Sequence, residues 1–172
     1  MIRQGVILAG GLGSRLYNED SFTPKPLIHV GGMALIERII VLMKNAGIEL
    51  IVIVLGHQSE QIVNFIRDRE YRGIVTVINN EYKKKNGISL LRSRSILNTE
   101  EPFLLSMADH VFSDDFFTEF IKRSKSLINN RSAVLSVDRN INGVFDLDDA
   151  TKVLIKSKNI VKIGKYLDLY NA

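Results

Sequence analysis

The feature that most constrains the fold is an apolar run that ends in a cluster of glycines. Val6-Ile7-Leu8-Ala9 is continuously apolar, which is typical of a strand buried on both faces of a parallel sheet. Gly10, Gly11 and Gly13 follow it directly. Glycine allows a tight turn and the close approach of a ligand, because it has no Cβ atom. A loop of this kind presents a row of peptide N–H groups, so the segment predicts an anion-binding site.

Two basic residues follow the glycines, and both suit a polyphosphate. Arg15 supplies a permanent planar cation with several donors. Lys25 lies between Pro24 and Pro26, which stiffen the backbone around it. The pattern is not the P-loop, and Leu16 stands where a dinucleotide fingerprint requires its third glycine. The less specific interpretation is a flexible turn with a surface arginine.

The rest of the chain alternates between strand-like and helix-like segments. Apolar runs predict strands at 50–55, 74–78, 103–107 and 133–137, and apolar residues at helical spacing predict helices at 34–44, 60–69, 88–97 and 116–127. Two alternating segments, 151–155 and 159–163, predict a hairpin. This order predicts an α/β fold in one domain over residues 1–172, with a mostly parallel sheet, helices on both faces and a C-terminal β-hairpin.

Several polar residues follow the predicted strands, at the edge where open α/β sheets bind ligands. Asp109 comes after an apolar strand, where a lone carboxylate is suited to binding Mg²⁺. Its alternative role is that of a turn or capping aspartate. Asn86-Gly87 alone would be an ordinary turn signal. We expect His57 to cap a helix or form hydrogen bonds rather than to catalyse a reaction.

Composition limits which partners and which cellular compartment we expect for this protein. The net charge is +4, but the basic residues are scattered and form one short run, Lys83-Lys84-Lys85. Small anionic molecules are therefore expected as partners in preference to nucleic acid. The chain has no cysteine, which excludes disulfides and thiolate metal sites. With no leader-like start and no apolar run of about 20 residues, we expect a cytoplasmic protein without a membrane segment.

The sequence LAGGLGSRL at 8–16, followed by PKPL at 24–27, resembles the signature of nucleotidyltransferases that join a nucleoside triphosphate to a phosphorylated sugar or alcohol. The resemblance implies a Rossmann-like domain with Arg15 and Lys25 as catalytic residues on the phosphates and Asp109 as the ligand of Mg²⁺. It implies nucleotide contacts from Leu8, Ala9, Gly10, Gly11, Gly13, Ser14, Asn86, Gly87 and Ser89. Lys152 is a weaker candidate for binding the acceptor phosphate.

Three shorter features resemble inositol-1-phosphate cytidylyltransferases: MADH at 107–110, NGISLL at 86–91, and the segments 137–139, 148–153 and 163–165. They imply transfer from CTP to a phosphorylated polyol, with inositol 1-phosphate favoured, giving a CDP-alcohol and pyrophosphate. The alternatives are a sugar-1-phosphate nucleotidyltransferase that uses dTTP, UTP or GTP, and a nucleotide-binding module without catalysis. The family pattern continues with a strand carrying an Asp-Thr-Gly-like segment. No counterpart follows the hairpin, so we expect a C-terminally truncated domain.

Overall fold

The computed structural model describes residues 2–11, 23–128 and 133–172. The chain divides into two compact units, Met1–Asn130 and Arg131–Ala172. Each unit is described by itself below, and the single domain expected from the sequence stays a prediction.

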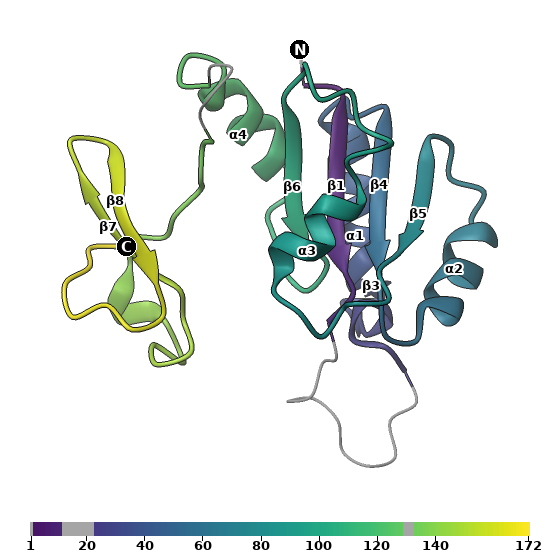
Figure 1. The fold of residues 1–172 in the computed structure, drawn as a ribbon, viewed down its shortest axis with the longest axis horizontal. Helices are drawn as coiled ribbons and strands as arrows, with labels where there is room; N and C mark the ends of the chain where they lie inside the picture. The colour runs from purple at the N-terminus through teal and green to yellow at the C-terminus, as the bar shows by residue number, and fades with distance from the viewer. Residues whose placement is uncertain (1, 12–22, 129–132) are drawn as a thin grey trace. The chain divides into compact units, whose positions relative to one another are not determined.

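The first unit is built on a four-stranded parallel sheet with the order β5-β4-β1-β6 (Figure 1). Its strands are β1 (Gln4–Ala9), β4 (Leu50–Leu55), β5 (Ile74–Ile78) and β6 (Phe103–Met107). The two central strands are almost entirely buried. Their uninterrupted apolar sequences are explained by this position, because both faces of a parallel sheet are covered.

Helices cover both faces of this sheet (Figure 1). One face packs against α1 (Leu35–Asn45), α2 (Ser59–Arg67) and α4 (Phe116–Ser124), and the opposite face packs against α3 (Asn86–Arg92). Successive side chains of a strand point to opposite faces. Ile7 accordingly lies in the larger core with α1, whereas Val6 and Leu8 pack against Leu90 of α3. The predicted α/β fold with helices on both faces is confirmed.

Among the described residues, three short elements precede α1 in the chain. A 3₁₀ helix, η1 (Lys25–Leu27), precedes the two-stranded pair of β2 (His29–Val30) and β3 (Met33–Ala34). Pro24 and Pro26 are buried on either side of Lys25. Helix α3 ends earlier than predicted, since Ser93 Oγ donates a hydrogen bond of 2.7 Å to the carbonyl of Leu90 and such local bonds compete with helix continuation.

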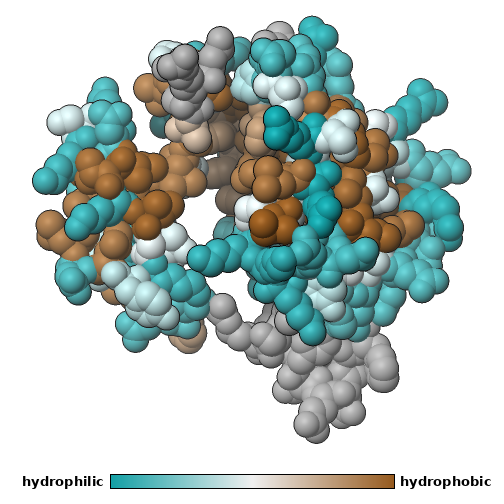
Figure 2. Space-filling model, in the orientation of Figure 1, coloured by the Kyte–Doolittle hydropathy of each residue, from teal (hydrophilic) through white to brown (hydrophobic). Residues whose placement is uncertain are grey.

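The second unit carries the predicted hairpin, which is confirmed as β7 (Lys152–Lys156) paired antiparallel with β8 (Asn159–Gly164). The two turn residues, Ser157 and Lys158, both have positive φ angles, as a two-residue hairpin turn requires. Figure 2 shows apolar surface on this unit. Ile160 and Ile163 of β8 are exposed apolar residues. A short 3₁₀ helix, η2 (Ile141–Gly143), precedes the hairpin.

The strand predicted at 133–137 is wrong, because those residues have no strand conformation and are exposed or half-buried. An apolar run forms a strand only where a neighbouring strand pairs with it and a face of it is covered. None of the described helices combines the length and the apolar character that crossing a bilayer requires.

Candidate functional site

The carboxyl ends of β1, β4 and β6 lie abreast at one edge of the sheet (Figure 1). The strand register pairs Ala9 with Leu55 and Leu8 with Met107, and the N–H of Ala108 donates a hydrogen bond of 3.0 Å to the carbonyl of Leu8. The residues that follow these strands, among them Gly10 and Asp109, therefore come together. Ligands bind at this edge in open α/β sheets.

Gly56 allows three segments to meet at this edge. A Cβ atom at position 56 would lie 2.6 Å from the carbonyl oxygen of Gly10 and 2.4 Å from the Cβ of Tyr82. Gly10 and the loop after β5 thus both contact the end of β4 through the space that glycine leaves. The His57 ring lies 6.0 Å from the Tyr82 ring, centroid to centroid, at 39°. The contact to Tyr82 was not predicted from the sequence, because nothing local marks it.

Lys25 and Asp109 form an ion pair, although 84 residues separate them in the chain. Lys25 Nζ lies 2.8 Å from Asp109 Oδ2, and each side chain is about a third exposed, at 31% and 34%. The buried prolines on either side of Lys25 hold its backbone in place. The structure therefore brings together the residue predicted to bind phosphate and the residue predicted to bind metal.

His110 contacts the other oxygen of the same carboxylate. Its Nδ1 lies 3.0 Å from Asp109 Oδ1, and its ring stacks on Phe112 at 5.8 Å between centroids. The hydrogen bond with His110, followed by the hydrogen bond and charge of Lys25, holds the pKa of Asp109 well below its usual range, although partial burial acts in the opposite direction. Asp109 is thus a carboxylate at neutral pH, with both oxygens in contact with potential donors.

Helix α3 and the loop before it form the wall of a surface hollow. An open hollow of about 650 Å³ lies at the start of α3, and it is lined by Lys83, Lys84, Lys85, Gly87, Ile88 and Leu91. Asn86 and Gly87 are exposed here, whereas Ser89 is buried. The hollow therefore combines lysine side chains with an apolar helix surface, which suits a ligand with both anionic and flat apolar parts.

Some of the remaining predicted site residues follow or belong to β1, some lie outside the described residues, and one is in the second unit. Leu8 and Ala9 are buried in β1, and Gly10 and Gly11 follow that strand. Gly13, Ser14 and Arg15 lie outside the described residues. Lys152 is in β7 of the second unit, where its Nζ donates hydrogen bonds to the carbonyls of Leu147 (2.7 Å) and Lys165 (2.8 Å).

A parallel α/β sheet with a lysine–aspartate pair at its carboxyl edge is typical of α/β proteins that bind nucleotides. Residues 5–141 match the family described as the MobA-like NTP transferase domain. The chain belongs to this family of nucleotidyltransferases.

Two curated relatives match nearly the whole chain. The 2-aminoethylphosphonate cytidylyltransferase of Lancefieldella rimae is 35% identical over 160 residues, which are 93% of this chain and 60% of that protein. The bifunctional IPC transferase and DIPP synthase of Archaeoglobus fulgidus is 32% identical over 166 residues, which are 96% of this chain and 30% of that protein. The chain thus spans only part of the length of these relatives.

Among solved structures, the inositol-1-phosphate CTP transferase from T. maritima matches with a TM-score of 0.78 and 25% identity, over 99% of this chain and 66% of that one. A CTP:phosphocholine cytidylyltransferase from Streptococcus pneumoniae is 33% identical, with a TM-score of 0.52 over 66% of this chain.

Proposed function

We propose that this chain provides the nucleotide-binding part of a cytidylyltransferase that transfers a cytidylyl group from CTP to a phosphorylated polyol, with inositol 1-phosphate as the favoured acceptor. The Lys25–Asp109 ion pair at the carboxyl edge of the sheet carries the proposal, because it combines a cation suited to phosphate with a carboxylate suited to a metal ion. The names of the relatives support CTP as the donor.

In the proposed reaction, a phosphate oxygen of the acceptor attacks the α-phosphorus of CTP in line. A new P–O bond forms as the bond to the bridging oxygen of the β-phosphate breaks, and pyrophosphate leaves with that electron pair. No covalent intermediate with the protein is needed, so the protein positions the two substrates and stabilises charge. Lys25 would bind the α-phosphate, and Arg15 would bind the β- and γ-phosphates.

The residues at the sheet edge fit a magnesium ion that is shared with substrate. Mg²⁺ is usually held by one or two carboxylates together with substrate phosphates, and Asp109 offers one ionised, partly exposed carboxylate. The described residues contain no group of three or more potential protein ligands that would form a complete cage. When bound at Asp109, the ion would supply charge neutralisation between the two anionic substrates.

The wall formed by α3 would contact the nucleoside. Asn86 and Gly87 are exposed at its start, and a Cβ at position 87 would meet no atom within 4 Å. This open space allows a base and ribose to approach the backbone closely. Ser89 is buried and accepts a hydrogen bond from Asn79, so it would contribute by holding α3 in place rather than by direct contact with the nucleoside.

A second acceptor class is 2-aminoethylphosphonate, and the 35% identity with a cytidylyltransferase of that name favours it. The donor, the leaving group and the predicted residues would be the same. Only the acceptor site would differ, and a phosphonate would replace the phosphate as the attacking group.

The test is the release of pyrophosphate from CTP and Mg²⁺ with each acceptor in turn. Removing one preorganised charged group typically lowers the rate by about 10²- to 10³-fold, so Lys25→Ala and Asp109→Asn should each reduce turnover by about this factor. Lys122→Ala is the matched control, since it also removes a lysine from an ion pair, with Glu119 at 3.4 Å on the exposed surface of α4. Near-normal turnover in Lys25→Ala would refute the assigned role.

A further inference from the structure

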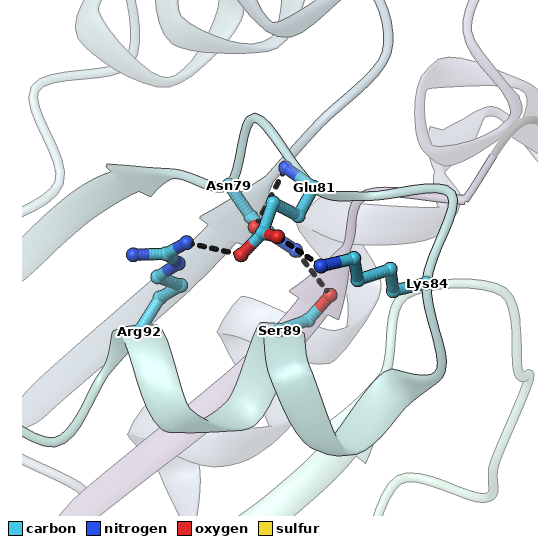
Figure 3. Close-up of polar contacts among 5 residues, drawn as sticks. All are labelled: Asn79, Glu81, Lys84, Ser89 and Arg92. Carbon is cyan, nitrogen blue, oxygen red and sulfur yellow. Dashed lines mark hydrogen bonds and ion pairs between the residues drawn. The ribbon is translucent and has the colours of Figure 1, made fainter.

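Asn79 is a fully buried polar side chain that joins the end of β5 to α3. It is 0% exposed, and its backbone N–H donates a hydrogen bond of 2.8 Å to the carbonyl of Leu55 at the end of β4. Its Nδ2 donates to Ser89 Oγ at 2.9 Å, and its Oδ1 accepts from the N–H of Glu81 at 3.0 Å (Figure 3). One residue thus ties the sheet edge, the loop after β5 and α3 together.

Glu81 forms further polar contacts between the same loop and α3. Its carboxylate accepts hydrogen bonds from Arg92 Nη2 at 2.6 Å and from Lys84 Nζ, so it joins the last turn of α3 to the loop before the helix (Figure 3). Both cations are largely exposed, and exposed ion pairs contribute little. The buried amide of Asn79 is therefore the stronger constraint on the position of α3.

The Asn79–Ser89 hydrogen bond fixes which side of α3 faces the hollow. Ser89 lies two residues after Gly87 and is 5% exposed, whereas Gly87, Ile88 and Leu91 line the hollow. Residues two positions apart lie on nearly opposite sides of a helix. Fixing Ser89 to the interior therefore fixes Gly87 outward, and a rotation of α3 would move the surface that lines the hollow.

We propose that Asn79 is a positioning residue of the nucleotide site, which sets affinity and base selectivity by fixing the orientation of α3. This inference rests on the proposed function. Asn79 itself contacts no nucleotide, since it is enclosed by the protein, and it acts through Ser89 and the loop that begins at Glu81.

The chain offers a matched control for a purely structural role. Gln4 is also a buried amide, 4% exposed. Its Nε2 donates to the carbonyls of Asn98 (2.7 Å) and Glu101 (3.2 Å), and its Oε1 accepts from the N–H of Asn98 (3.0 Å). It ties down a loop at the amino end of β1, the opposite edge of the sheet from the candidate site.

The experiment measures the Kd of CTP and of UTP, each with Mg²⁺, by titration calorimetry below the unfolding transitions. Asn79→Ala should raise the Kd of CTP by about tenfold or more, a difference of about 1.4 kcal/mol, and should bring the CTP and UTP values closer together. Each of the two substitutions removes a buried amide, so Gln4→Ala and Asn79→Ala should lower the unfolding temperature by similar amounts. Gln4→Ala should nevertheless leave the Kd of CTP and the Kd of UTP within about twofold of the unchanged chain.

Ser89→Ala removes the same hydrogen bond from the helix side, and it provides the test if Asn79→Ala does not fold. It should raise the Kd of CTP and weaken base selectivity in the same way. Equal changes in Kd for Asn79→Ala and Gln4→Ala, with CTP still bound by the unchanged chain, would overturn the inference and leave the proposed function standing. Failure of the unchanged chain to bind any nucleotide would overturn both.

Discussion

Replacing Gly56 by alanine should destabilise the first unit by breaking the contact between three loops. The added Cβ would lie 2.4 Å from Tyr82 Cβ, 2.8 Å from Tyr82 Cγ and 2.6 Å from the carbonyl oxygen of Gly10. Carbon atoms in contact are normally about 3.5 to 4.0 Å apart, so the tyrosine would have to move by about 1 Å. The Gly10 carbonyl is backbone and cannot turn away as a flexible side chain can.

Overpacking a well-packed site typically costs about 1 to 3 kcal/mol. We expect the upper part of this range, about 2 to 3 kcal/mol, because two neighbours are contacted at once and one of them is a backbone carbonyl. For a unit of this size the melting temperature should fall by about 5 to 10 °C. Since the displaced segments are the first loop and the loop before α3, nucleotide affinity should fall as well.

Thermal and urea unfolding of Gly56→Ala and Gly87→Ala, side by side, measure this prediction. A Cβ at position 87 meets nothing within 4 Å, and alanine is favoured over glycine in a helix by about 0.5 to 1 kcal/mol. Gly87→Ala should therefore leave stability unchanged or slightly raised. Equal stability of the two variants would refute the argument that Gly56 is required by close approach.

Two further predictions concern stability rather than nucleotide binding. The Tyr71 hydroxyl donates to Glu37 Oε1 at 2.9 Å, and burial, followed by this hydrogen bond, raises the pKa of Tyr71 to about 12. The folded state favours the protonated phenol, so the contribution of Tyr71 to the free energy of unfolding is present below about pH 10 and is lost as pH rises toward 12. In Tyr71→Phe, the free energy of unfolding should no longer fall for this reason between about pH 10 and 12. An unchanged dependence of unfolding on pH would contradict the reasoning. Lys152→Met should leave the carbonyls of Leu147 and Lys165 without this donor and lower the stability of the second unit by about 1 to 3 kcal/mol. The measurement is amide hydrogen exchange in β7 and β8, which should become faster; unchanged exchange would contradict the prediction.

The fold was largely predictable because its signals are local. Apolar runs predicted β1, β4, β5 and β6, and in the two central strands, β1 and β4, such a run corresponds to burial on both faces of the sheet. The turn between β7 and β8 is flanked by alternating residues. The run at 133–137 carries a similar local signal without becoming a strand. Strand formation depends on a partner, and a partner is a property of the whole fold.

The candidate site was predictable only in part. Sequence patterns singled out Lys25 and Asp109 separately, but their pairing is a tertiary contact across 84 residues and no local spacing predicts it. Asn79 reads as an ordinary turn residue after a strand. Its importance follows from complete burial and from its partner Ser89, and both are visible only once α3 has packed on the sheet.

The central claim is that this chain binds CTP in preference to other nucleoside triphosphates. The most direct measurement is the shift in unfolding temperature with CTP, UTP, dTTP, GTP or ATP, each in the presence of Mg²⁺. A nucleotide at about 100 times its Kd adds roughly 2.7 kcal/mol to stability, which gives a clear shift. The account predicts the largest shift with CTP, whereas a larger shift with another nucleotide, or no shift with any of them, would contradict it.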